Sequence, residues 1–279
     1  VSAITKQVVH INGQAFVDDV DLIFGSRDTQ TPATDLIAEC QSALNRWCGL
    51  LWSTGGLIVP RKSKFWLIEF DWDGNDFVYK TKDELQGELH VTDGDQHSVP
   101  IQQLNVSESW ESLGIWMSMD GNMNKQKEVL LKKSVEFAAQ ICTSSCSKND
   151  ALYTYGFSFL KTLEYCMICT TFSENDWRTI VWPALRATLH KAGMSSRFPR
   201  ESLYGPTLYM EHGWKHPYYL QEIKRFLTLI HEAVDPKSQT GKIMISSLEM
   251  LKVDVGVDFD FRTSGSKVFT SYVPSCWFT

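Results

Sequence analysis

The sequence of 279 residues lacks the features that would direct it into a membrane or a secretory pathway. Its apolar runs stay well below the roughly 18 residues that a membrane-spanning helix needs. No basic and then apolar segment at the N-terminus predicts a signal peptide. We therefore expect an intracellular protein, cytoplasmic or nuclear, that is not secreted and has no membrane partner. Because residue 1 is Val and strand-like sequence begins at once, we interpret the chain as an N-terminally cut fragment.

Motifs for zinc binding are missing as well. The pairs Cys142/Cys146 and Cys166/Cys169 lie in segments with helical periodicity, and no His follows them at the spacing of a zinc finger. These four cysteines are therefore interpreted as buried apolar side chains, and all seven thiols of the chain are expected to be free. With 43% hydrophobic residues, ten Trp and fifteen Phe, the chain can bury a sizeable core.

The net charge of −6 hides an asymmetry along the chain. Residues 1–122 hold 8 Lys/Arg against 18 Asp/Glu, whereas residues 123–279 hold 19 against 15. An acidic half joined to a mildly basic half suits a protein that holds cations in one part and contacts polyanions with the other.

The pattern of apolar residues changes at the same point. Before residue 123, one amphipathic helix is predicted from Pro32, with Thr31 as its cap, to Gly55-Gly56. The other predicted elements before this point are strands, at 6–11, 15–17, 20–24, 65–70, 77–79 and 113–117. Later, helices are expected at 124–143, 150–171, 174–192 and 217–234. The sequence thus predicts an α+β chain with domains 1–122 and 123–279.

Two adjacent acidic residues interrupt an apolar stretch near the N-terminus. In Phe16-Val17-Asp18-Asp19, an aromatic and a small apolar residue precede two carboxylates at the turn of a predicted hairpin. Hard divalent cations such as Mg²⁺ prefer ligands that are oxygen atoms only. Two-metal sites for phosphoryl transfer need such acidic groups on rigid strands.

This four-residue motif resembles the catalytic aspartate-pair hairpin of reverse transcriptases, the RNA-directed DNA polymerases of retrotransposons and other transposable elements. The order of the following elements is similar to that family too. A palm-like helix at 32–54 is followed by a turn, 55–62, that carries glycines and a lysine. The Leu113-Gly114 step resembles a hairpin that grips the primer end. The resemblance implies a partial polymerase palm over residues 1–122 and a mostly helical thumb-like or connection region over 123–279.

The resemblance also implies roles for single residues in nucleotidyl transfer. Asp18 would be the ligand shared by the catalytic metal ions, and Asp19 its neighbour in the metal site. Lys62, with Lys64 as the competing choice, would protonate the pyrophosphate leaving group. Leu113 and Gly114 would position the primer terminus. Phe16 and Val17 would support the hairpin.

The implied cofactor is Mg²⁺ or Mn²⁺, expected only in the complete polymerase. The implied partners are an RNA or DNA template with its primer and deoxynucleoside triphosphates. The family also needs an upstream strand with a metal-binding Asp and a nucleotide-selecting helix, and this sequence has neither before Phe16. We therefore expect the isolated chain to be an inactive nucleotidyltransferase fragment.

Two other classes stay open. The chain could be a non-catalytic nucleic-acid-binding module or a decayed retroelement remnant. Alternatively, Asp19-Val20-Asp21 is an Asp-x-Asp triple of the kind that glycosyltransferases use to hold a metal-bound sugar nucleotide. That reading requires a βαβ nucleotide-binding pattern around the triple.

Overall fold

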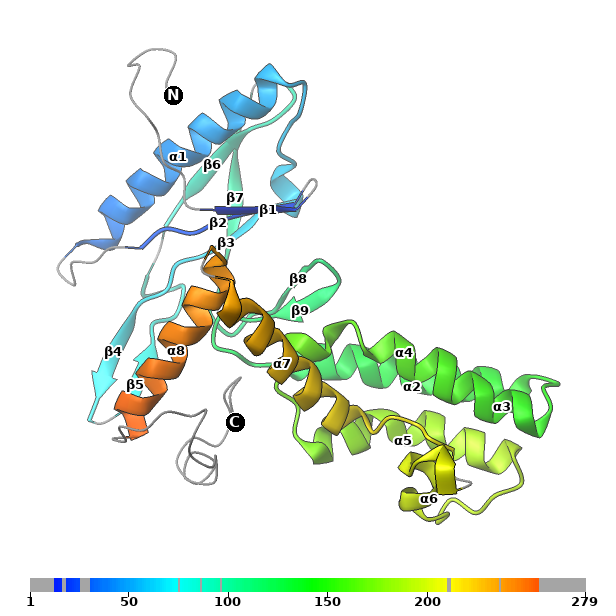
Figure 1. Ribbon diagram of the computed structural model, residues 1–279. Helices are drawn as coiled ribbons and strands as arrows, with labels where there is room; N and C mark the ends of the chain where they lie inside the picture. The colour runs from blue at the N-terminus through cyan, green and yellow to red at the C-terminus, as the bar shows by residue number, and fades with distance from the viewer. Residues whose placement is uncertain are drawn as a thin grey trace. The chain divides into compact units, whose positions relative to one another are not determined.

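A computed structural model describes residues 13–16, 19–25, 31–74, 76–85, 87–95, 97–209, 212–235 and 237–255. The side chains at 13–16, 19, 76, 254 and 255 lie outside this description. The chain is a mixture of helices and small sheets (Figure 1). It divides into two compact units, Val1–Asn122 and Met123–Thr279, at the boundary expected from the sequence. The predicted strand at 6–11 lies outside the described residues.

The long helix of the first unit begins one residue later than expected. α1 (Ala33–Ser53) starts after Pro32, which is the N-cap and provides no side-chain hydrogen bond, so the predicted cap at Thr31 was wrong. The predicted end is confirmed. Gly55, at a φ of 81°, turns the chain, and the Gly56 N–H donates to the Leu51 carbonyl at 2.8 Å. A glycine adopts this left-handed conformation without steric cost.

A three-stranded sheet carries the core of the first unit. Its strands are ordered β3 (Lys64–Trp66), β7 (Ser98–Leu104) and β6 (Leu89–Thr92), with β3 parallel and β6 antiparallel to β7. α1 packs against β6 (Figure 1). The buried members of this cluster come from the helix and from two strands: Leu44, Leu89, Val91 and Ile101.

The open edge of β6 is closed by a side chain of α1. The Gln41 amide donates from Nε2 to the His90 carbonyl at 2.8 Å, and its Oε1 accepts from the His90 N–H at 2.7 Å. Across the sheet His90 lies opposite Pro100, which has no N–H to offer. Gln41 thus bonds the backbone groups of an edge strand that would otherwise need water or another chain.

Two hairpins complete the first unit beside the N-terminal one. β4 (Phe70–Asp73) pairs with β5 (Asp76–Tyr79), and β8 (Trp110–Ser112) pairs with β9 (Ile115–Met117). The predicted strand 65–70 was therefore wrong as one element, because β3 ends at Trp66 and β4 begins at Phe70. The predicted strand 77–79 is confirmed within β5.

The second unit is helical. Its α-helices are α2 (Asn124–Thr143), α3 (Lys148–Thr154), α4 (Leu160–Leu163), α5 (Glu174–Lys191), α6 (Arg200–Tyr204), α7 (Pro217–Val234) and α8 (Gln239–Val255). Shorter turns of 3-10 or π type lie at η1 (Pro60–Lys62) in the first unit and at η2 (Tyr155–Phe159), η3 (Cys166–Ile168) and η4 (Thr207–Tyr209) in the second. The helices expected at 124–143, 174–192 and 217–234 are confirmed.

The helix expected at 150–171 is broken into α3, the π turn η2, α4 and η3. The break has a tertiary cause. The π turn contains Gly156, where a side chain would clash with the indole of Trp214, so this position lets Trp214 pack against the turn. π turns insert an extra residue and are accommodated by such local packing.

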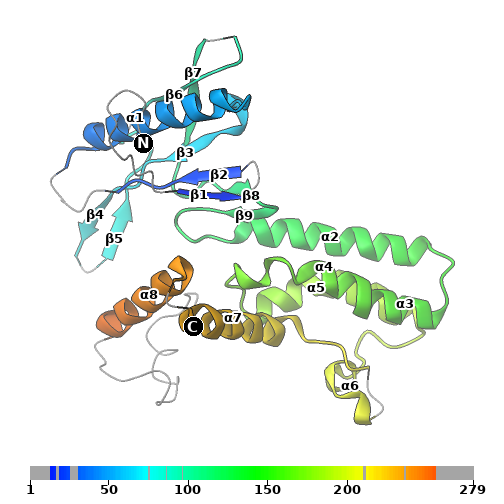
Figure 2. The ribbon, with the colours of Figure 1, turned by 45° about the horizontal axis from the view of Figure 1, so that its top comes forward.

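α2 and α5 lie side by side and make the most extensive helix–helix contact of the second unit (Figure 2). Pro183 inside α5 disrupts the helical hydrogen bonds around it. The Ala184 N–H donates instead to Ser134 Oγ of α2 at 3.2 Å, and Ser134 is fully buried. A side chain of α2 therefore accepts a backbone hydrogen bond next to the point where Pro183 interrupts α5.

Candidate functional site

The aspartate-pair motif lies at a two-stranded hairpin. β1 (Gly13–Phe16) pairs antiparallel with β2 (Asp19–Leu22), and the register places Phe16 directly opposite Asp19. Val17 and Asp18, which the sequence assigns to the tip and to metal binding, lie outside the described residues, as do the side chains of Phe16 and Asp19. Val17 and Asp18 are the two residues between Phe16 and Asp19 in the sequence, and Phe16 and Asp19 are paired across the two strands.

The second strand of the hairpin, β2, packs against the core of the first unit. Along β2 and beyond it, half-buried Val20, Leu22 and Phe24 alternate with exposed Asp21 and Ile23. This period of two is that of a strand with one face packed. Leu22 packs against the cluster formed by α1 and the three-stranded sheet. The position of Asp19 is therefore tied to the core through a neighbour three residues along.

The two candidate lysines differ in their surroundings. Lys62 ends the short turn η1 and is exposed. Lys64 lies in β3, where its ammonium donates to Gln102 Oε1 and lies 5.2 Å from the centre of the Trp110 ring. A lysine held by an amide and an aromatic face is less available as a proton donor than an exposed one. The geometry therefore favours Lys62 over Lys64.

Leu113 and Gly114 are turn residues rather than the start of a strand, so that part of the strand prediction was wrong. They join β8 to β9, with Ser112 opposite Ile115, and both have positive φ, 50° and 79°. Two left-handed residues are typical of a tight hairpin turn that matches the strand twist. Leu113 is also exposed. A leucine in this conformation is strained, and such strain often marks a functional position.

The loop after β9 fixes this hairpin. The Asp120 carboxylate accepts from the Ser118 hydroxyl and, at 2.9 Å, from the Asn122 N–H. Gly121 has a φ of 78°, and the Met119 N–H donates to the Val106 carbonyl at 3.0 Å. β9 ends at Met117, as the predicted strand 113–117 does, and this hydrogen-bonded loop explains why the strand stops there.

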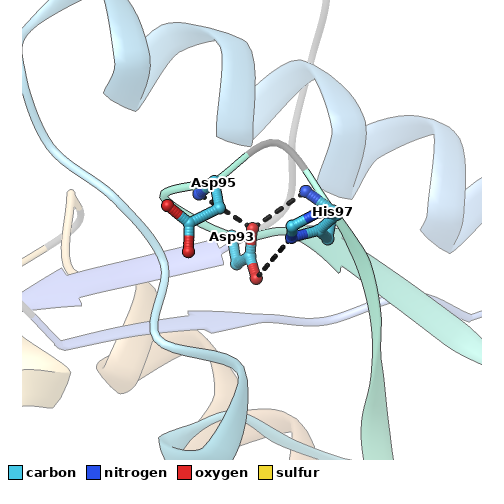
Figure 3. Close-up of side chains that lie close together, drawn as sticks. All are labelled: Asp93, Asp95 and His97. Atoms are coloured by element: carbon cyan, nitrogen blue, oxygen red, sulfur yellow. Dashed lines mark hydrogen bonds and ion pairs between the residues drawn. The ribbon is translucent and has the colours of Figure 1, made fainter.

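A group of possible metal ligands that the sequence analysis missed lies in the turn between β6 and β7. Figure 3 shows the Asp93 carboxylate between Asp95 and His97. Asp93 Oδ1 accepts from the Asp95 and His97 N–H groups at 3.0 and 2.9 Å, and Oδ2 lies 3.8 Å from His97 Nδ1. An aspartate that accepts backbone bonds two residues on is a common turn device. The turn itself accounts for this cluster.

The Asp-x-Asp alternative finds little support in the topology. The parallel pair β3–β7 is connected through β4, β5 and β6, and no helix lies in the described residues of that connection, 67–74, 76–85, 87–95 and 97. A nucleotide-binding βαβ unit places a helix there. Asp21 is exposed on β2, which pairs only with β1 among the described strands.

The cysteines are free thiols at all six described positions. Cys166 is buried, and burial raises its pKa. Cys142 and Cys169 are exposed, so the expectation that the cysteines of these two pairs are buried was wrong for both. In the described part of the chain, residues that could jointly hold a metal ion are found only at Asp93, Asp95 and His97.

Comparison with known proteins gives no relative: no family model, no curated protein and no solved structure matches the chain. Among the described helices, none combines the length and the apolar character required to cross a bilayer.

Proposed function

We propose that the chain is the later palm and the thumb-like region of a retrotransposon-type RNA-directed DNA polymerase. One observation carries the proposal: a hairpin with Phe16 opposite Asp19 is followed directly by a helix and a sheet that anchor it. Metal-dependent phosphoryl transfer needs carboxylates on rigid strands, and the motif belongs to a strand pair that is anchored to the core.

Each candidate residue has a role in that reaction. The primer 3′-hydroxyl attacks the α-phosphorus of a nucleoside triphosphate, and pyrophosphate leaves in line with it. Asp18 and Asp19 supply carboxylate oxygens, the donors that Mg²⁺ or Mn²⁺ prefers. A bound ion would activate the hydroxyl and stabilise charge on the phosphate. Lys62 gives a proton to the leaving pyrophosphate. The exposed turn at Leu113-Gly114 supports the primer end.

Primer extension tests the proposal most directly. We expect no extension in a single turnover by the 279-residue chain, because one hairpin supplies only part of a metal clamp. A longer product that includes the coding sequence upstream of Val1 is expected to extend the primer. Asp18→Asn in that product should lower the rate by about 10³-fold or more. Asp21→Asn, exposed on the same hairpin, is the matched control and should change the rate by less than about threefold.

The outcomes separate the parts of the proposal. Extension by the 279-residue chain alone would show that its metal site is complete, contrary to our expectation. Full activity of Asp18→Asn in the longer product would remove Asp18 from the catalytic site. No activity in any longer product would leave polymerisation without support.

Nucleic-acid binding without catalysis is the second candidate, and one observation favours it. Lys132 and Lys133 of α2 and Arg186 of α5 are exposed, on helices that pack together. Contacts between such side chains and phosphates weaken steeply with salt. Affinity for a primer–template that falls with NaCl but does not depend on Mg²⁺, in the absence of extension by any product, would favour this class.

A further inference from the structure

α7 (Pro217–Val234) packs in an unusual orientation, with polar residues inside and apolar residues outside. Its buried positions include Gln221, 0% exposed, and Arg225, 5% exposed. Gln221 Oε1 accepts from Thr170 Oγ1 and Trp177 Nε1, both at 2.9 Å, and its amide donates to the Phe172 carbonyl. The side-chain amide of Gln221 is therefore engaged within the helix's own unit through both its oxygen and its nitrogen.

The opposite face of α7 carries a continuous apolar stripe. Six large side chains on it are exposed, from 46% to 77% of their surface: Tyr219, Ile223, Phe226, Leu227, Ile230 and Val234. Their spacing of three and four residues places them on one side of the helix. A helix that turns such a face outward has a surface suited to a partner.

The stripe is symmetric along the helix. Tyr219 and Val234 lie equally far from the midpoint between Phe226 and Leu227, and Ile223 and Ile230 also lie equally far from it. In an antiparallel pair of identical helices with a two-fold axis at that midpoint, each position meets its mirror position. A partner with a different sequence would impose no such symmetry. The two-fold arrangement is the most common one in homodimers.

We infer that the occupant of this stripe is a second copy of the chain, bound through α7 in antiparallel orientation. Ile223 of one copy then faces Ile230 of the other, and Phe226 and Leu227 of both copies meet at the two-fold axis. This inference is independent of the proposed polymerase function. It rests only on the exposure and the spacing of α7.

The surface available fits a weak but specific dimer. Six side chains, each about half exposed, offer on the order of 600 Å² per copy, near the lower end of specific interfaces. The apolar character of the stripe favours association in the micromolar range.

Sedimentation velocity of the full 279-residue chain, from about 1 to 100 µM, tests the inference. We expect a concentration-dependent shift from monomer to dimer. Ile223→Glu should raise the dissociation constant by about tenfold or more, because it would place a charge in the seam. The control is Leu208→Glu, which changes an 83% exposed leucine of η4 and should leave the equilibrium unchanged. Circular dichroism confirms that both variants are folded.

The register is tested by a paired exchange. In the antiparallel arrangement, Ile223→Lys combined with Ile230→Glu places each lysine opposite a glutamate of the other copy. This double variant should dimerise more tightly than Ile223→Glu or Ile223→Lys alone. A parallel arrangement would place like charges together and give no recovery. A chain that stays monomeric at every concentration, a dimer that Ile223→Glu leaves intact, or no recovery in the double variant would each overturn the inference.

Discussion

The two units of the chain bury their side chains to different depths. In Met123–Thr279 the largest core residues are completely enclosed, with Trp177, Ile180 and Leu189 each 0% exposed. In Val1–Asn122 the deepest cluster is small, and Leu44, Leu89, Val91 and Ile101 retain 2–8% exposure. The second unit encloses its core between long helices, whereas the first unit covers a small sheet with one helix.

The β4–β5 hairpin of the first unit is an example of an element whose aromatic side chains are only partly buried. The rings of Phe70, Trp72, Phe77 and Tyr79 contact one another edge-to-face or tilted, with ring centres 5.3 to 6.3 Å apart, and Phe70, Trp72 and Phe77 remain about half exposed or more. Beside it, the Glu69 carboxylate accepts from Lys80 and raises the pKa of that lysine. Two-stranded hairpins have little stability of their own. We therefore expect the first unit, which carries the candidate site, to open at a lower free energy than the second.

The largest effect is expected from Trp177→Ala. Trp177 is fully buried and donates from Nε1 to Gln221 Oε1, so its removal leaves a cavity and takes away one of the two hydrogen bonds that this oxygen accepts. The second unit should lose about 4 kcal/mol of unfolding free energy. Urea denaturation followed by far-ultraviolet circular dichroism measures this loss, and the transition of the first unit should stay in place.

Trp182→Ala is the control in the same helix. Trp182 is 36% exposed and lies under the Arg200 guanidinium at 5.3 Å, so its loss should cost only about 1 kcal/mol. If the two tryptophan variants were equally destabilised, the contrast in burial between the two positions would not describe the protein in solution.

The periodicity of apolar residues was sufficient to predict the long helices and the place of the hairpin that carries Phe16 and Asp19. α2 and α7 repeat apolar residues at every third or fourth position, so their bounds could be predicted. The break in 150–171 could not, because it depends on Trp214 approaching Gly156 from 58 residues away. Contacts between distant segments override local preference.

The candidate site could also be predicted from the sequence only in part. The pattern of Asp18 and Asp19 could be recognised locally, and the register of Phe16 with Asp19 agrees with a hairpin at that point. The choice between Lys62 and Lys64 could not be made locally, because Gln102, which engages Lys64, is 38 residues away. The left-handed conformation of Leu113 was missed since leucine gives no turn signal.

A core substitution in the first unit sharpens the comparison. Val91 is 2% exposed in β6 and belongs to the cluster with α1. Val91→Ala should lower the unfolding free energy of the first unit by about 2 kcal/mol, while the second unit keeps its transition. Thr92→Ala, exposed on the next position of the strand, should change it by less than about 0.5 kcal/mol. Loss of both transitions together in Val91→Ala would mean that the two units unfold as one.

We expect the stability of the second unit, and not that of the first, to depend on pH through Asp176. Burial alone would raise its pKa, but the ion pair with Lys127 of α2 and the bonds from Ser173 at the α5 N-terminus lower the pKa overall. A lowered folded-state pKa gives stability that is present above the unfolded value of about 3.9 and is lost as the pH falls through the folded value. Asp176→Asn should cost about 1 kcal/mol at pH 7.

The difference in unfolding free energy between the wild type and Asp176→Asn should vanish as the pH falls below about 4. Thermal melts from pH 3 to 8 measure it. Asp150→Asn is the matched control, because Ser147 and Asp150 form the same capping box on α3, and the pKa of Asp150 is lowered by Ser147 rather than by a lysine. Its loss at pH 7 should be smaller. A constant gap over the whole pH range would show that the Asp176 charge contributes nothing.

The smallest effect on stability, and the one closest to the candidate site, is expected at Leu113. Leu113→Gly removes the strain of a left-handed leucine and should stabilise the first unit by about 0.5 kcal/mol, since the gain is partly offset by glycine entropy. Leu113→Ala keeps the strain and removes the same exposed side chain. If the side chain supports a primer, both variants should lower extension by the longer product to a similar extent, although only the glycine variant is more stable. If extension instead followed stability, the role of Leu113 would be limited to the turn.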